Sequence, residues 1–517
     1  MVTLGSLWQA PPINPVNYKA RTIPVLNPIN KYGRVFFFSW WGFFISFWAW
    51  YAFPPLLTVT IRQDLDLTRD QIANSNIAAL TGTLLVRFFA GPACDRFGPR
   101  WTYIGILIAG SIPTAMAGLV KNWQGLIALR FFVGILGGTF VPCQVWSMGF
   151  FDKNVVGSSN ALIGGWGNAG GGITYFLMPL IYDSLKSDQG LSSSVAWRVA
   201  FIVPFILIVS TALGMLLFCD DTPTGKWSER HANVERILNT YGINQSTIVS
   251  IPGDVDHKVT STGTSTPAMT SDSEKGKAPL SSTSDNNSSS KIELSQGEMI
   301  EIARAQIVQP PTLTHLLRVL TSPQTLFHCA TYFCSFGGEL AINSYLGAYY
   351  FRNFPSLEQT GSGRWASMFG LLNIITRPLG GILSDVIYKH TSSVWAKKAW
   401  IVFVGIVSGA FLIAIGLTDP RNQGLMFGLV AGMAVFLEAG NGANFALVPH
   451  VHPSANGVLS GIIGAAGNFG GVCFAVLFRF HGTRYEESLW IAGVMIVGLN
   501  VVLCWVKPVP KGKDGLR

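Results

Sequence analysis

Two stretches of the chain share one pattern: Arg87-Phe-Phe-Ala-Gly91-Pro-Ala-Cys-Asp95 and Arg377-Pro-Leu-Gly-Gly381-Ile-Leu-Ser-Asp385. Both read Arg-x3-Gly-x3-Asp, and they are offset by 290 residues. A second pattern repeats in the same order, at an offset of 300 residues, as Gly164-Gly-Trp-Gly167-Asn168-Ala-Gly170-Gly171 and Gly464-Ala-Ala-Gly467-Asn468-Phe-Gly470-Gly471. Two matches in the same order indicate that the chain is built from two related halves.

The composition is that of a membrane protein. Only 12% of the 517 residues are charged, where a soluble protein carries about 25%, and the mean hydropathy is +0.38. These values exclude a soluble globular fold, a disordered chain and a disulfide-rich secreted scaffold. The net charge of +9 fits the basic cytoplasmic loops of membrane proteins better than nucleic-acid binding, which we do not expect. Residues 1–33 contain no cleavable signal peptide.

Twelve apolar runs are long enough to cross the hydrocarbon layer as helices, which takes about 20 residues. They lie at about 35–59, 72–94, 101–120, 124–148, 157–180, 197–219, 326–351, 364–386, 396–418, 424–447, 457–479 and 488–507. We therefore predict an all-α membrane protein with twelve transmembrane helices in two pseudo-symmetric six-helix bundles. The predicted divisions are a tail 1–34, a bundle 35–219, a linker 220–325 that is largely disordered at 259–290, a bundle 326–507 and a tail 508–517.

Lysine and arginine counts predict the orientation. The two tails, the linker and the loops on their side, with Lys397 and Lys398 counted among the loops, hold 23 of these residues, and the opposite face holds ten. The excess places both termini and the linker in the cytoplasm. Three arginines remain inside predicted helices, at Arg87, Arg130 and Arg377. A charge at that depth is costly and indicates function, although each could instead be a packing arginine bonded to backbone carbonyls.

The repeated polar residues are predicted to meet near the middle of the membrane. Each of Arg87 and Arg377 lies eight residues, or about 12 Å, before the aspartate of its motif. Asn168 and Asn468 lie about 17 Å along their own helices. Secondary transporters bind their substrates at the midplane between two repeats. No metal cluster, nucleotide loop or nucleophile constellation is present, so we expect neither an enzyme nor a cofactor.

Several motifs resemble those of a known family. Gly91-x3-Asp95-Arg96-x-Gly98-x-Arg100 resembles the loop signature of the major facilitator superfamily, and Arg130 in Arg130-Phe-Phe-Val-Gly134 looks like its fourth-helix arginine, which implies a structural or gating-associated role. The segments around Asn168 and Asn468 resemble the paired signatures of the nitrate/nitrite porter family. The similarity covers all twelve predicted helices and is greatest to fungal high-affinity nitrate transporters, which implies the superfamily fold.

The resemblance also implies a binding site. It assigns Arg87 and Arg377 as anion-binding guanidiniums, places Asn168 and Asn468 in or behind the site, and surrounds the anion with aromatic rings. The matching rings are Phe47, Phe140, Phe336 and Tyr332. Guanidinium is planar and offers parallel donors, so two of them suit a flat monoanion such as nitrate or nitrite.

Import of an anion into a negative cell interior costs about 2.3 kcal/mol per 100 mV. The resemblance implies proton symport as the compensation, and Glu339 and Glu438 are the acidic residues best placed inside helices to carry the proton, unless they only pair with neighbours. Nitrate/nitrite exchange and an anion channel are the alternatives. We expect a monomer in the plasma membrane whose partners are nitrate, nitrite, protons and lipid.

Overall fold

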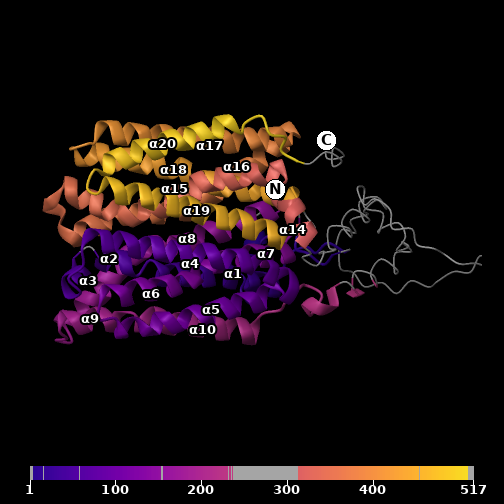
Figure 1. Ribbon diagram of the computed structural model, residues 1–517. Coiled ribbons are helices and arrows are strands. Elements are labelled where there is room, and N and C mark those ends of the chain that lie inside the picture. The colour runs from indigo at the N-terminus through magenta and orange to yellow at the C-terminus, as the bar shows by residue number, and fades with distance from the viewer. Residues whose placement is uncertain are drawn as a thin grey trace, which may run out of the picture.

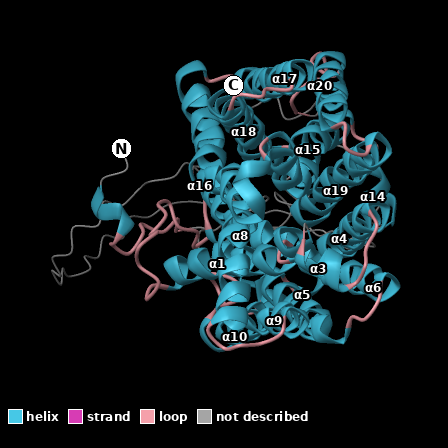
Figure 2. Ribbon diagram, turned by 90° about the vertical axis from the view of Figure 1, so that its left-hand side faces the viewer, coloured by secondary structure: helices cyan, strands magenta, loops and turns pink. Residues whose placement is uncertain are grey.

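The protein is almost entirely α-helical in the computed structural model, which describes residues 4–15, 17–57, 59–152, 155–230, 232–233, 236, 313–452 and 455–509. The expected linker falls largely outside these residues, as does the segment 259–290 within it. The long helices run side by side, with the first half of the sequence at the bottom of Figure 1 and the second half above it. Figure 2 looks along the helices and shows the two groups facing each other.

The helices of the first half follow the predicted apolar runs. They are α1 (Lys31–Trp50), α2 (Phe53–Leu57), α3 (Thr60–Asp64), α4 (Arg69–Phe97), α5 (Pro99–Ala115), α6 (Trp123–Val133), α7 (Phe140–Phe150), α8 (Val156–Ser187), α9 (Ser193–Ala200) and α10 (Ile202–Phe218). Short 3-10 helices are η1 (Leu4–Leu7), η2 (Met116–Leu119), η3 (Gly134–Thr139) and η4 (Trp227–Glu229). The run predicted at 124–148 is therefore interrupted, because η3 joins α6 to α7 through three glycines.

The second half has the same plan. Its helices are α14 (Leu313–Leu320), α15 (Pro323–Asn353), α16 (Glu358–Thr391), α17 (Val394–Thr418), α18 (Gln423–Leu447), α19 (Asn456–His481) and α20 (Tyr485–Val502), with the 3-10 helices η5 (Pro355–Leu357) and η6 (Val448–His450). The described segments near both chain ends lie at the right-hand end of Figure 1, which we call the linker end.

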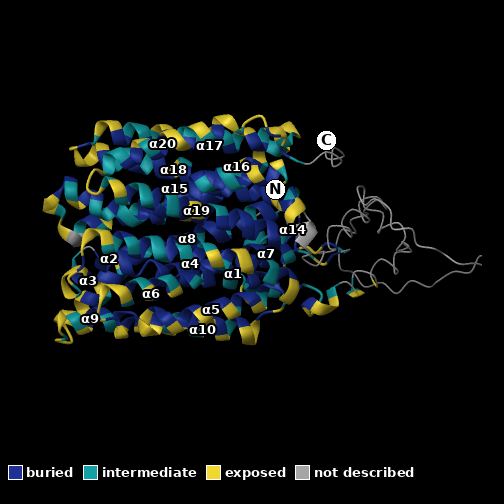
Figure 3. Cartoon of the chain, in the orientation of Figure 1, coloured by how far each residue is buried: buried dark blue, intermediate teal, exposed yellow. Residues whose placement is uncertain are grey.

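Ten helical segments in the described residues are long and apolar enough to span a membrane. The helices α8 and α15, with 32 and 31 residues, have the length but not the hydropathy, because glycine and polar side chains replace apolar ones. Both lie in the interior, where Figure 3 shows mostly buried residues, while the outer helices α10 and α20 expose apolar side chains such as Leu217 and Val502. The protein therefore has the predicted twelve-helix membrane fold, with its least apolar helices shielded by the others.

Two matched contacts join the halves at the linker end. The carboxylate of Asp95, at the end of α4, accepts a hydrogen bond of 3.1 Å from the backbone N–H of Val458 at the start of α19. The carboxylate of Asp385, near the end of α16, accepts one of 3.3 Å from the hydroxyl of Ser158 at the start of α8. The aspartates of the two repeated motifs thus hold the linker end of the molecule together.

Two lysines that the sequence analysis counted in a loop are buried instead. Lys397 and Lys398 lie near the start of α17, with 4% and 2% of their surfaces exposed. Lys397 Nζ lies 2.6 Å from Asp385 Oδ1, and Lys398 donates to the carbonyls of Cys504 and Val506. Both lysines are buried because α17 begins before its apolar run. Their acceptors come from distant segments, so the composition alone does not reveal these contacts.

Candidate functional site

Arg87 is held by backbone oxygens from both halves. Its side chain is fully buried on α4, where Nε donates to Gly137 O at 2.9 Å and Nη1 donates to Gly464 O at 3.0 Å. Gly137 lies in the 3-10 segment η3, and Gly464 belongs to α19 in the second half. The third nitrogen, Nη2, is buried and has no partner among the described residues.

Arg377 occupies the matching position on α16 with 1% of its surface exposed. Its Nη2 donates to the hydroxyl of Tyr332 at 3.0 Å, and its Nη1 has no partner in the described part of the chain. Gly164 leaves room for this side chain, because a Cβ there would lie 2.8 Å from Arg377 Nε. In the other half, a Cβ at Gly464 would lie 3.3 Å from Arg87 Cδ. The glycine motif of each half therefore accommodates the arginine of the other.

The two guanidinium groups face the same two aromatic rings. The Cζ atom of Arg87 lies 4.8 Å from the centroid of Phe140 and 5.0 Å from that of Phe336. The corresponding distances for Arg377 are 5.5 and 5.7 Å. The two rings are stacked with their centroids 6.0 Å apart, and Tyr332 stacks on Phe336 at 4.9 Å. The structure thus brings together five of the residues that the sequence analysis selected.

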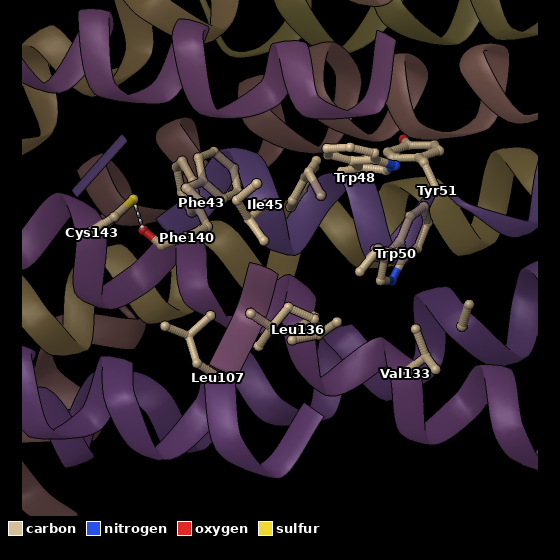
Figure 4. Packing of buried hydrophobic residues seen from close by; sticks show 14 of the residues in the cluster. Phe43, Ile45, Trp48, Trp50, Tyr51, Leu107, Val133, Leu136, Phe140 and Cys143 are labelled. Atoms are coloured by element: carbon tan, nitrogen blue, oxygen red, sulfur yellow. Dashed lines mark hydrogen bonds between the residues drawn. The ribbon is translucent and has the colours of Figure 1, made fainter. Parts of the chain in front are cut away.

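Phe47 lies one ring further out. Its ring contacts Phe43 at 4.4 Å, and Phe43 contacts Phe140 at 5.5 Å. Figure 4 shows Phe43 beside Phe140 in this cluster. The sequence analysis missed both Phe43 and Phe445, a ring on α18 that meets Phe140 edge-on at 4.9 Å. With 34 phenylalanines in the chain, ring content alone could not have distinguished them.

Glu339 is the centre of an amide cluster beside this site. Its Oε1 accepts hydrogen bonds from the Nδ2 atoms of Asn168 at 3.2 Å and Asn373 at 2.9 Å. Its Oε2 accepts one from Asn441 Nδ2 at 2.5 Å. The carboxylate is 6% exposed, and its partners come from α8, α16 and α18. Asn168 is the one partner from the first half, so this hydrogen bond links the two halves.

Glu438 and Asn468 occupy less central positions. Glu438 is fully buried on α18, where Oε2 accepts from the hydroxyl of Thr376 and Oε1 has no partner among the described residues. Asn468 Nδ2 donates to Gly464 O at 3.0 Å, the carbonyl that also receives Arg87 Nη1. Asn468 therefore lies behind Arg87, whereas Asn168 contacts Glu339.

Comparison with known proteins identifies the family. The profile described as Major Facilitator Superfamily matches residues 39–475. This chain belongs to the major facilitator superfamily. The proton:xylose symporter XylE, solved with 6-bromo-6-deoxy-D-glucose, has a TM-score of 0.61 at 12% identity and matches 90% of this chain and 94% of its own. At that identity XylE shows the fold alone.

Two relatives of this superfamily member match nearly the whole chain. Elsinochrome transporter 1 of Elsinoe fawcettii is 35% identical, and the match covers 99% of both chains. High affinity nitrate transporter 2.5 of Arabidopsis thaliana is 30% identical over 94% of this chain and 82% of its own. The Arabidopsis relative, together with further relatives named as nitrate transporters, places the chain in the nitrate/nitrite porter family. It is a transporter and not an enzyme.

The sequence analysis overlooked two residues that contact the buried carboxylates. Asn441 and Thr376, which bind the two buried carboxylates, were not selected. Asn441 carries the signal that singled out Asn168, an amide at lipid depth that needs a partner, in the segment Gly440-Asn-Gly-Ala-Asn444. Thr376 carries no comparable signal, because threonine is common in membrane helices as a donor to its own backbone.

Proposed function

We propose that this protein is a secondary active transporter that imports nitrate and nitrite by proton-coupled symport with alternating access. One observation carries the proposal. Two buried arginines from opposite halves, Arg87 and Arg377, face the same pair of rings, and each keeps a buried nitrogen without a partner in the described residues. The relatives that are named as nitrate transporters support the choice of anion.

The chemistry of these groups suits a flat monoanion. The free Nη2 of Arg87 and Nη1 of Arg377 would donate to oxygens of the anion, and such charge-assisted bonds are about twice as strong as neutral ones. Phe140 and Phe336 keep water away from the guanidiniums, which strengthens each electrostatic contact. Planar guanidiniums that lie over flat rings favour a planar oxyanion over a tetrahedral one. We assign Asn168, Asn468, Tyr332 and Phe47 to the surroundings of the anion.

Anion binding would favour a closed, occluded state. Without the anion, two positive charges face each other across the interface between the halves, and binding relieves their repulsion. A ligand shifts a conformational equilibrium only through such a differential interaction. The interface is closely packed, because a Cβ at Gly91 would lie 2.6 Å from Gly457 O and one at Gly370 would lie 2.5 Å from the Cα of Gly172. Rocking of one half against the other would open it.

Glu339 is our candidate for the proton carrier, with Glu438 as the second. As a carboxylate, Glu339 accepts a hydrogen bond from Asn168 across the interface, and the positive charge of Arg377 stabilises its negative charge. Protonation would remove a negative charge beside the anion site and weaken the bond to Asn168. Proton and anion would then enter together, which makes a one-to-one cycle electroneutral and avoids the cost of about 2.3 kcal/mol per 100 mV for an anion alone.

The topology follows from the basic residues. We propose a monomer in the plasma membrane, with both termini and the linker 220–325 in the cytoplasm, and bundles at 35–219 and 326–507. The linker end of Figure 1 would then face the cytoplasm, so Asp95 and Asp385 would hold the cytoplasmic side closed.

Three other functions compete with this one. Nitrate/nitrite exchange would use the same arginines but would need no protonatable group. An anion channel would need a continuous polar pore, against which the glycine-packed interface argues. The third alternative is transport of a different substrate, because one fungal relative is named as an elsinochrome transporter. The facing arginines favour a small anion over the cargo of this fungal relative.

The deciding experiment is uptake of 15N-nitrate by the full chain in proteoliposomes with imposed pH and voltage gradients. Symport predicts accumulation when the outside is acidic and none when the pH gradient is collapsed. Exchange predicts uptake only into vesicles that are preloaded with nitrite, whatever the pH gradient. No saturable uptake under any gradient, combined with elsinochrome transport by the same vesicles, would overturn the proposal in favour of the cargo of the fungal relative.

A further inference from the structure

Arg130 is a third buried arginine, and the central site does not use it. It lies on α6 with 1% of its surface exposed. Its Nη1 donates to Ser75 Oγ at 2.8 Å and to Asn76 Oδ1, both on α4. The other two nitrogens, Nε and Nη2, are buried and have no hydrogen-bond partner in the described residues. Packing against α4 therefore uses one nitrogen of three.

No counter-ion balances this charge among the described residues. None of the ion pairs in the described part of the chain includes Arg130, and its Cζ lies 5.5 Å from the ring of Phe53. By contrast, Arg198 at the same end of the first half lies 2.8 Å from Asp64. A buried cation without a counter-ion is strongly unfavourable. The contacts that Arg130 makes with the described residues are a hydroxyl, an amide oxygen and a ring, all of them uncharged.

A polar stripe on α4 leads from Arg130 to the central site. Asn76, Thr83 and Arg87 are spaced seven and four residues apart, so they share one face of the helix. The stripe covers about 16 Å at 1.5 Å per residue. Midway along it, the hydroxyl of Thr83 accepts from Trp50 Nε1 at 3.0 Å and donates to Gly134 O at 2.7 Å. Arg130 lies at the stripe's far end, away from the linker end.

We propose that Arg130 forms a second anion subsite, which receives a small planar monovalent oxyanion before it reaches Arg87 and Arg377. The inference rests on the proposed function for the class of ligand and for the direction of import. The free Nε and Nη2 are adjacent donors on one edge of the guanidinium, the edge that binds two oxygens of an oxyanion at once. An anion here supplies the charge that the surroundings of Arg130 lack. The stripe then carries it inward past Thr83.

A binding experiment distinguishes this subsite from the central one. The full chain in detergent is titrated with sodium nitrate, with sodium gluconate at matched ionic strength as the control, and the melting temperature is followed. We expect the double variant Arg87→Gln/Arg377→Gln to lose the tight response but keep a saturable response at higher nitrate. Adding Arg130→Gln removes that residual response. A residual response that survives in the triple variant overturns the subsite. A double variant with the affinity of the wild type overturns the central site instead.

Transport kinetics test the subsite in a protein whose central site is intact. In proteoliposomes we expect Arg130→Gln to raise the KM for nitrate about tenfold, because a hydrogen bond to a charged group contributes on that order. The maximal rate per folded transporter stays within about twofold, since the central arginines are unchanged. Arg69→Gln, an exposed arginine at the start of α4, is the control for lost surface charge. An unchanged KM with a lower melting temperature overturns the proposal, because a purely structural arginine gives that result.

Discussion

The two central arginines share one sequence motif but have different surroundings. Arg87 is fixed by two backbone carbonyls, Gly137 O and Gly464 O. Arg377 is held by a side chain, the hydroxyl of Tyr332, and lies near the carboxylate of Glu339. Backbone oxygens move only when a helix moves, whereas a hydroxyl and a carboxylate can change partners. While the halves are closed, Arg87 therefore has a fixed anchor and Arg377 an adjustable one.

The repeat shows where this difference arises. The first long helix of each half carries an aromatic residue followed by Phe four positions later, as Phe43 and Phe47 in α1 and as Tyr332 and Phe336 in α15. Three residues further on, α1 has Trp50 and α15 has Glu339. Trp50 donates to Thr83, while Glu339 accepts from three amides. The halves thus share the aromatic pair next to the proposed anion site, and the second half adds an acid.

The largest effect is expected when either arginine becomes lysine. Arg87→Lys and Arg377→Lys keep the charge but lose the planar fork, so each removes more than one charged hydrogen bond of about 1.5–3 kcal/mol. We expect the KM for nitrate to rise at least 100-fold in both variants, measured as 13N-nitrate uptake into proteoliposomes. Arg69→Lys is the matched control on an exposed arginine of α4. Near-normal uptake in either central variant would contradict the assigned site.

Replacing Glu339 tests whether proton coupling can be lost while nitrate exchange is kept. Glu339→Gln keeps the shape of the side chain but has no group that gains and loses a proton near neutral pH. We expect accumulation driven by a pH gradient to fall at least tenfold, while exchange between nitrate-loaded vesicles and external 13N-nitrate persists within a few-fold.

Glu438→Gln is the matched comparison for Glu339→Gln, because Glu438 is also buried but contacts Thr376 rather than the amide cluster. If Glu438→Gln abolishes coupling and Glu339→Gln does not, the proton carrier is Glu438. If neither variant alters coupling, neither Glu339 nor Glu438 carries the proton.

The sequence was sufficient for those parts of the site that repeat. The offset motifs identified Arg87 and Arg377, and helix length and hydropathy predicted the twelve-helix fold. Glu339 could be selected as a buried acid, but its link to Asn441 depends on how α15 and α18 are rotated against each other. Buried Lys397 shows the same limit, since its partner Asp385 comes from α16. Contacts between helices are set by packing, which one sequence does not specify.

The two signature asparagines provide a smaller test of the same comparison. Asn168 donates to Glu339 in the other half, whereas Asn468 donates to a carbonyl of its own helix. We expect Asn168→Ala to lower uptake driven by a pH gradient about tenfold and Asn468→Ala about twofold, because only the first removes a bond between the halves. Uptake in proteoliposomes at equal protein content measures both. Equal losses would mean that the two halves act symmetrically.

The smallest effect concerns an acidic residue outside the membrane in each half. Asp419 lies 2.8 Å from Arg352 and 2.7 Å from Arg421, and Asp64 lies 2.8 Å from Arg198. Burial alone would raise the pKa of Asp419, but hydrogen bonds and the two arginines outweigh it and lower the pKa from its ordinary value of 3.8. A lowered pKa means that Asp419 stabilises the fold above that value and that this stabilisation is lost as the pH falls through the folded pKa.

We therefore expect Asp419→Asn to lower the melting temperature by about 1 °C at pH 7, since partly exposed ion pairs contribute about 0.2–1 kcal/mol. The difference from the wild type shrinks as the pH falls through the lowered pKa of the folded wild-type carboxylate, where that carboxylate becomes protonated. Asp64→Asn is the matched variant in the first half. Asp64 is paired with one arginine where Asp419 has two, so its effect is the smaller. Calorimetry from pH 3 to pH 7 measures both variants. A larger effect of Asp64→Asn would contradict the expectation that Asp419 contributes more to stability.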